Sequence, residues 1–588
     1  MTTTLLELTL PRTLDSWVAQ YAQADWHGAT IEGWLFEGLA ERRAAQAKLA
    51  AAGVRARLRS AYKPLVHFFL EEVDTASLAH VSVRYPVHRA ALPNRFLLEA
   101  YPLAALLPEG VLVFEAGGES TDYEVEMTFK TGLRQSARVF APNREHLDAT
   151  GATALSPTGW LRLRASGAAT CQRDAAYETE YERLFAEVLT AARQYPWPAQ
   201  EPYFQRLNIE VEHAGIEQIL PVGHEAISSA EALHEDLYFS LLEIFQKKSG
   251  REPADRRLQP GQIVPDVRAG TGAARVRMTL RDFDVAAQDQ CAAALPDSDS
   301  LLGDWSHAPH PRRIADVLWQ LGGRRFGATS VQGRRVEGRY LAGPGAAVLV
   351  SGGQHANETS GVVGALRAAQ ILAAEGSAHL AVIALENPDG YALHRELVAR
   401  QPRHMHHAAR YSALGDDIEY RQSAPFHERA ARSEALALSA AQLHVNLHGY
   451  PAHEWTRPLS GYVPRGFGLW TIPKGFFLVL RHQAGWQREG QVLLERVCHA
   501  LSLLPGLLDY NAAQLALYRA HAGTPTFDMR SGIPCTLTED NSRPGAPVTL
   551  ITEIPDETVD GDAFRFAHAV QTALVLAAVS AWQDLARS

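Results

Sequence analysis

The sequence predicts an α/β protein whose C-terminal domain has a mixed, mainly parallel central sheet flanked by helices, preceded by two β-rich α+β domains. Beyond residue 312, short continuous apolar runs alternate with helical segments, as in sheets buried on both faces. Before residue 200, apolar and polar residues alternate with period two, as in half-exposed strands. The predicted domains are residues 1–200, 201–311 and 312–588.

Length and composition limit the class of protein. At 588 residues the chain is too long for one hydrophobic core. The 46% of hydrophobic and 21% of charged residues are typical of a soluble globular protein. A net charge of −10 without a long Lys/Arg run argues against nucleic acid or an anionic membrane as the main partner, so we expect a small or peptidic substrate.

The cysteines and the N-terminus indicate the compartment. The four cysteines lack any paired spacing, so neither a disulfide framework nor a thiolate zinc site is expected. The N-terminus lacks a basic start followed by an apolar run, and no segment approaches 18 uninterrupted apolar residues. We therefore expect a cytoplasmic protein with no membrane partner.

The first two predicted domains contain strand-like runs and helices but no catalytic motif. HVSVRYPVH, VLVFEAG and YEVEMTF are strand-like, and the three prolines of ARQYPWPAQEPYF mark the first boundary. RLNIEVEH and RVRMTL are further strands, and SSAEALHEDLYFSLLEIFQKK is a helix opened by serine caps. These domains are expected to scaffold the third, to restrict access to its cleft or to form a homo-oligomer.

The third domain places polar residues directly after buried strands. AAVLVSGG is followed by the helical SGVVGALRAAQILAA, and HLAVIALENPDG and AQLHVNLHG are further strands. In such sheets the ligand lies beyond the carboxyl ends of the strands. His355 and Glu358 follow one strand, and His448 follows another. Two imidazoles and a carboxylate are the three protein ligands that a catalytic zinc ion needs, so these residues are predicted to bind Zn²⁺.

From about residue 312 to 588 the chain resembles the zinc metallocarboxypeptidases of the carboxypeptidase A family. GGQHANE is similar to the family's His-x-x-Glu, ENPDGY to its Asn-Pro-Asp-Gly-aromatic turn, and NLHGY to its third zinc histidine with the following tyrosine, here Tyr450. RQPRHMHH and LYRAHAGTPTFDMRSGIPCTLTED are similar to two further segments. The resemblance implies one zinc ion per catalytic domain.

The resemblance also implies roles for other residues. Arg400 and Arg403 stand where the family has an arginine pair, the second of which polarises the scissile carbonyl, although Arg395 and Arg410 lie nearby as competitors. Tyr518 corresponds to the tyrosine that caps the substrate. Glu539 corresponds to the catalytic glutamate, which takes a proton from water and gives it to the leaving amine.

Two positions leave alternatives open. Glu553 also ends an apolar strand-like run and is the rival of Glu539. In GDDIEYRQ, Arg421 is the candidate to bind a terminal carboxylate, but Tyr420 replaces the family's asparagine and acidic neighbours surround it. This departure bears on exopeptidase specificity.

The predicted function is a zinc metallocarboxypeptidase that hydrolyses a C-terminal peptide bond or a peptide-like amide. One alternative is an N-deacylase or small-molecule amidohydrolase similar to succinylglutamate desuccinylase and aspartoacylase. The other alternative is an inactive zinc-binding pseudoenzyme that serves as a binding module.

Overall fold

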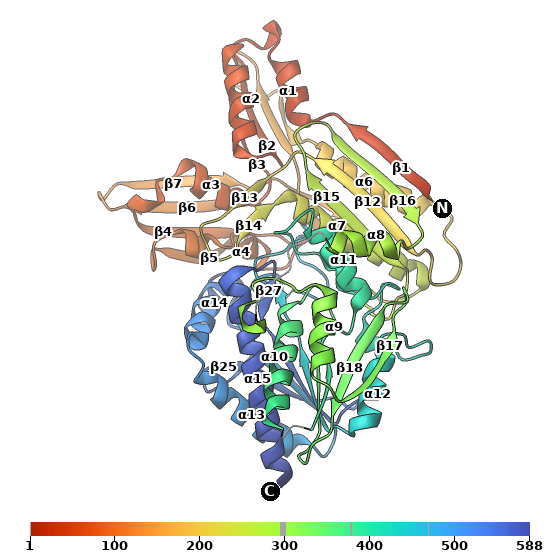
Figure 1. Ribbon diagram of the computed structural model, residues 1–588. Helices are drawn as coiled ribbons and strands as arrows, with labels where there is room; N and C mark the ends of the chain where they lie inside the picture. Colours follow the sequence, from red (N-terminus) through yellow and green to blue (C-terminus); the bar gives the residue numbers. More distant parts are fainter. Residues whose placement is uncertain (1, 294–300, 377–378, 469, 588) are drawn as a thin grey trace.

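The computed structural model describes residues 2–293, 301–376, 379–468 and 470–587. The N-terminal half forms three four-stranded sheets and two two-stranded ones, and it lies over one end of a larger C-terminal unit (Figure 1). The predicted class, a mixed α/β chain with β-rich N-terminal regions, is confirmed at this level.

The first N-terminal sheet, in the order β11-β10-β2-β3, carries the projecting helices α1 and α2 (Figure 1). Its elements are α1 (Thr13–Tyr21), β2 (Thr30–Leu35), α2 (Leu39–Ala51), β3 (Arg55–Ser60), β10 (Trp160–Arg164) and β11 (Arg173–Ala176). Apolar residues from both helices and from β2, β3 and β10 form a separate small core.

The second sheet, in the order β5-β4-β6-β7, contains the three strands that the alternating pattern predicted. Its elements are α3 (Pro64–Glu72), β4 (Leu78–Val87), β5 (Leu112–Glu119), β6 (Asp122–Phe129) and β7 (Arg134–Phe140). Along β6, Tyr123, Val125 and Met127 are buried and the intervening glutamates are exposed, as period two requires.

The third sheet, in the order β1-β16-β12-β15, crosses the domain boundary predicted at residue 200. Its elements are β1 (Thr3–Leu10), α6 (Glu180–Gln194), β12 (Arg206–His213), α7 (Ser229–Ser249), β15 (Gln262–Ala269) and β16 (Ala274–Arg281). β1 pairs with β16, so the first strand completes a sheet made otherwise from residues 206–281. Ser228 caps α7 by accepting a hydrogen bond from the Glu231 amide, as predicted.

The C-terminal unit is built on a nine-stranded sheet in the order β17-β18-β20-β19-β21-β26-β23-β25-β24. The strands are β17 (Arg324–Thr329), β18 (Arg335–Leu341), β19 (Val348–Gly352), β20 (Leu380–Ile383), β21 (Leu443–Leu447), β23 (Phe477–His482), β24 (Asp528–Arg530), β25 (Ile533–Glu539) and β26 (Val548–Glu553). The central strands β20, β19, β21 and β26 are parallel, whereas β17, β18, β23 and β24 join antiparallel. The sheet is therefore mixed as expected, with parallel pairs at its centre and between β23 and β25.

Helices cover both faces of this sheet because its central strands are apolar on both sides. Val348 and Val350 of β19 face the core beneath α10 (Ser360–Glu375), α13 (Gln487–Ser502) and α15 (Gly561–Arg587). Leu349 faces α12 (Arg429–Ser439) on the opposite side. By length and composition α15 is the one described helix that could cross a membrane by itself, but 56% of its apolar stretch is buried, as in the core helix of a soluble protein.

A single large core joins the N-terminal half to the C-terminal unit. It includes Tyr62, most of α7, and Trp455 and Tyr518 of the C-terminal half. Glu231 and Glu243 of α7 are buried and form ion pairs with His453 and Arg457 of the C-terminal unit. Glu235 of α7 is also buried and shares a hydrogen bond with His407. The N-terminal sheets are therefore packed against the unit that holds the predicted site.

Candidate metal centre and active site

The carboxyl ends of three parallel strands bring the candidate ligands together. His355 and Glu358 lie in the turn between β19 and α10, and His448 directly follows β21. β26 pairs in parallel with β21, with Leu447 opposite Thr552. His448 follows Leu447 and Glu553 follows Thr552, so these two residues lie beside each other at the same edge of the sheet.

His355, Glu358 and His448 form a compact set of ligand atoms. Nδ1 of His355 lies 2.8 Å from one Glu358 oxygen, and Nδ1 of His448 lies 2.8 Å from the other. The two Nδ1 atoms are 3.1 Å apart, and all three side chains are buried. Imidazole nitrogen and carboxylate oxygen are donors that zinc prefers, so the three residues fit a catalytic zinc ion.

The charges around these residues favour a cation. Burial lowers the pKa of His355, but the carboxylates of Glu358 and Asp417 outweigh burial and raise it. Burial raises the pKa of Glu358, but its histidine partners and Arg410 hold that pKa well below the usual range. Burial lowers the pKa of His448, which favours the neutral imidazole that binds metal.

Asp417 lies behind His355, one of the candidate metal ligands. Its Oδ2 lies 3.3 Å from Nε2 of His355, opposite the Nδ1 that faces Glu358. Its Oδ1 accepts a hydrogen bond from Gln354. A carboxylate on the outer nitrogen fixes the tautomer and the ring orientation of a ligand histidine.

The Gly449 of the His-Gly-Tyr motif is required by close packing. A Cβ at this position would overlap Oδ1 of Asp556. Asp556 accepts a hydrogen bond from the amide of Ser360 at the start of α10 through its other oxygen, at 2.9 Å. The glycine thus lets the strand end approach the carboxylate that holds the helix behind the metal ligands.

A cavity of about 260 Å³ opens beside the metal ligands. Its wall includes His355, His448 and Glu553 at the strand ends, Tyr450 and Trp470 in the loop after β21, and Arg432 of α12. Arg256, from the loop between α7 and β15, also lines the cavity, and its Nη1 lies 3.6 Å from Asp417. The N-terminal half therefore contributes directly to this wall.

Glu553, rather than Glu539, lies beside the metal ligands. Glu539 is exposed, accepts a hydrogen bond from Asn541, and does not line the cavity. β25 runs opposite to β26, because both flank β23, which is parallel to β25 and antiparallel to β26. Glu539 and Val548 both pair with His482, so Glu539 lies near the first residue of β26. Glu553 is the last residue of β26, about 17 Å away along that strand.

The side chain of Glu553 faces the cavity. Within the described part of the chain it forms no hydrogen bond or ion pair. Burial and the charge of Glu358 raise its pKa well above the usual range, against the opposing charges of Arg410 and Lys474. Glu539, to which the resemblance gave the role of catalytic glutamate, lies outside this cavity.

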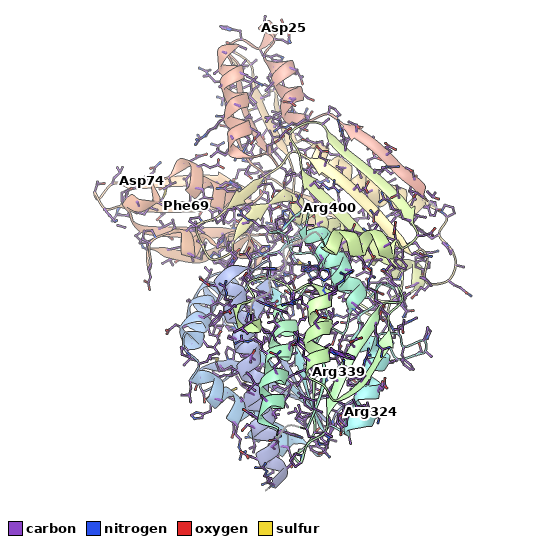
Figure 2. The ribbon with its side chains drawn as sticks, viewed as in Figure 1. Asp25, Phe69, Asp74, Arg324, Arg339 and Arg400 are labelled. Atoms are coloured by element: carbon purple, nitrogen blue, oxygen red, sulfur yellow. The ribbon has the colours of Figure 1, made fainter. Side chains whose placement is uncertain are left out.

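The predicted arginine pair lies away from the cavity. Arg400 follows α11 (Pro388–Val398), where Figure 2 shows it at the junction with the N-terminal half, and its Nη1 lies 2.6 Å from Asp266. Arg403 is exposed. Arg410 lines the cavity instead, with Nη1 2.6 Å from Oε1 of Glu358.

Three other predicted residues are held by structural contacts. Arg421 is buried between Asp416 and Glu428, each 2.6 Å from its guanidinium, and does not line the cavity. Tyr518 is buried in α14 (Leu507–Ala522) and is also outside the cavity wall. Tyr450 lines the cavity, but its hydroxyl donates to the Gly475 carbonyl at 2.6 Å.

Comparisons with known proteins give distant structural likenesses. No protein-family model and no curated protein matches the chain. A putative metallopeptidase from Shewanella denitrificans is 14% identical, with a TM-score of 0.30, over 46% of this chain and 88% of its own.

Two metallo-carboxypeptidases are similarly distant. The enzyme from Burkholderia cenocepacia is 12% identical, with a TM-score of 0.29, over 53% of this chain and 76% of its own. The enzyme from Pseudomonas aeruginosa, in complex with (2-guanidinoethylmercapto)succinic acid, is 15% identical, with a TM-score of 0.29, over 53% of this chain and 75% of its own. At these values the chemistry of the site has to be argued from the side chains of this chain.

Proposed function

We propose that the chain is a zinc-dependent hydrolase that cleaves a peptide or peptide-like amide bond, with Glu553 as the group that transfers protons. The observation that carries this proposal is the convergence of His355, Glu358 and His448, with Glu553 on the neighbouring strand end, in one cavity. A zinc ion held by these three residues would lower the pKa of a bound water and polarise a carbonyl.

The residues of the chain account for the remaining chemistry. Glu553 faces the cavity without a competing partner among the described side chains, so it can take a proton from water and give it to the leaving amine. Arg410 supplies a permanent positive charge near the reacting carbonyl oxygen, where negative charge develops. Arg410 takes the role that the sequence assigned to Arg403.

An amidohydrolase acting on N-acyl compounds is the second candidate. Arg421, the candidate that the resemblance offered to bind a terminal carboxylate, is paired with Asp416 and Glu428. Arg421 is therefore not available to bind the terminal carboxylate of a peptide. An inactive zinc-binding module is the third candidate, and the free carboxylate of Glu553 argues against it.

The test compares Glu553→Gln with Glu539→Gln, two isosteric changes at strand ends. Zinc content would be measured by mass spectrometry. Hydrolysis would be measured on peptides with free C-termini, on peptides with blocked C-termini and on N-acyl amino acids. We expect wild-type protein and both variants to bind one zinc ion, and only Glu553→Gln to lose activity, by about 10²- to 10⁴-fold. Absence of zinc, or activity that survives Glu553→Gln, contradicts the proposal; cleavage of N-acyl amino acids alone selects the second candidate.

A further inference from the structure

The cavity extends well beyond the metal ligands along the face of the sheet. His448, Asn446 and His444 line it at every second residue of β21 and its end. Glu553, Ile551 and Thr549 do the same on β26. His444 lies four residues before His448, and four residues of extended strand span about 13 Å. The end of the cavity near His444 and Thr549, its floor, is therefore farther from the candidate metal ligands than the length of a substrate side chain.

Arg481 lies at this floor. It is on β23 directly opposite Thr549, and it is half-buried in the cavity wall. Among the residues that the structure describes, no acceptor or carboxylate lies within hydrogen-bond or ion-pair distance of its guanidinium. Burial, and after it the charge of Arg543, lowers the pKa of Arg481.

The other arginines of the cavity all have carboxylate partners. Arg410 pairs with Glu358 at 2.6 Å, Arg432 with Glu386 at 2.5 Å, and Arg543 with Asp540 at 2.9 Å. Arg256 lies 3.6 Å from Asp417.

The acidic side chains near the floor are already paired with other arginines. Glu419 forms ion pairs with both Arg432 and Arg543. The guanidinium of Arg481 is partly withdrawn from water and has no carboxylate partner among the described residues, which costs free energy. An anion that binds beside it would offset that cost.

We propose that Arg481 binds a carboxylate on the leaving portion of the substrate, so that the enzyme prefers peptides or amides whose leaving group is acidic. This inference rests on the proposed function, because it places the scissile bond at the metal ligands. The carboxylate comes either from an acidic side chain or from the chain terminus. Arg481 is thus a specificity residue at the opposite end of the cavity from Glu553.

Four dipeptides separate the two sources of carboxylate: N-acetyl-Ala-Glu, N-acetyl-Ala-Gln and the C-terminal amide of each. We expect the Gln amide, which has no carboxylate, to have a kcat/KM about tenfold or more below the best member of the set. A preference for the Glu amide over the Gln acid identifies the side chain, and the reverse order identifies the terminus. Equal cleavage of the Gln amide and the best acid overturns the inference.

Arg481→Met tests the residue itself. It should lower kcat/KM for the preferred acid about tenfold or more and leave the Gln amide unchanged, while Arg481→Lys retains part of the preference. Arg488→Met, at an exposed position in α13, is the matched control and should change neither. An equal loss on all four compounds would mean a structural role and would overturn the inference.

Binding distinguishes this inference from the proposed function. Zinc-loaded Glu553→Gln, with and without Arg481→Met, would be titrated with the four dipeptides by calorimetry, a readout that needs no turnover. Tighter binding of the acids than of the Gln amide, abolished by Arg481→Met, supports the carboxylate site even if wild-type protein cleaves none of the four. Equal binding of all four compounds overturns it even if hydrolysis is observed.

Discussion

Asp417 lies against the outer nitrogen of His355, with 3.3 Å between Oδ2 and Nε2, while the inner nitrogen faces Glu358. Because this contact fixes the ring, we expect Asp417→Asn to weaken zinc affinity by about 10- to 100-fold. Competition with a chromogenic chelator would measure the change. Asp416→Asn, one residue away but paired with Arg421, is the control, and equal zinc loss in both variants would contradict the orienting role.

Arg410 should act on turnover more than on substrate binding. Its guanidinium lines the cavity 2.6 Å from Glu358, so Arg410→Met removes a positive charge next to the developing oxyanion. We expect kcat to fall by about 10²- to 10³-fold with zinc content retained. Arg403→Met, at an exposed position, should have activity close to wild type; an equal fall in both variants would restore the role predicted for Arg403.

His453 should make stability depend on pH above neutrality. Its Nε2 lies 2.6 Å from Glu231 of α7, and although burial lowers its pKa, Glu231, Glu225 and Glu557 raise it to about 9. A folded-state pKa above the ordinary value of about 6.5 stabilises the fold below pH 6.5, and this contribution is lost as pH rises through 9.

Urea unfolding at pH 6.5 and pH 9.5 measures this contribution. The difference in unfolding free energy between wild type and His453→Gln should be larger at the lower pH and should shrink at the higher one. His499→Gln, at an exposed position of α13, should show no such change. A His453→Gln difference that is the same at both values would contradict the assignment of charge to His453.

The buried pair of Arg457 and Glu243 should stabilise the contact between α7 and the C-terminal unit. Its Nη1–Oε1 distance is 2.7 Å, and a second bond joins Nη2 and Oε2 at 3.1 Å. Arg457→Met leaves Glu243 buried without its partner, so we expect a loss of about 3–5 kcal/mol in unfolding free energy. Arg84→Met, which breaks an exposed pair with Glu124, should cost less than about 1 kcal/mol.

The sequence could predict that the candidate metal ligands converge, because His355 and Glu358 follow one buried strand and His448 follows another within a few residues. His355, Glu358 and His448 needed only the rule that parallel strands end at one edge. To place Glu553 beside these residues, the order of the strands in the sheet must also be known. The strand of Glu553 lies beside that of His448, whereas the strand of Glu539 runs in the opposite direction. No local pattern encodes that reversal.

The arginine that lines the cavity was harder to predict from the sequence, for a related reason. Arg400, Arg403 and Arg410 share one irregular stretch, and only tertiary packing decides which of them faces the cavity. Arg256 could not be found from a motif, because it reaches the site from a loop roughly one hundred residues away from any metal ligand with no local signal of its own.

Helix α7 is buried in the core that joins the two halves of the chain, and this matters for expression of the C-terminal half alone. A fragment that begins at residue 312 would lack Glu231 and Glu243, so His453 and Arg457 would lose their charged partners on a newly exposed apolar surface. We expect such a fragment to be less soluble than the full chain, because this apolar surface would face water. Expression of the whole chain avoids that exposure.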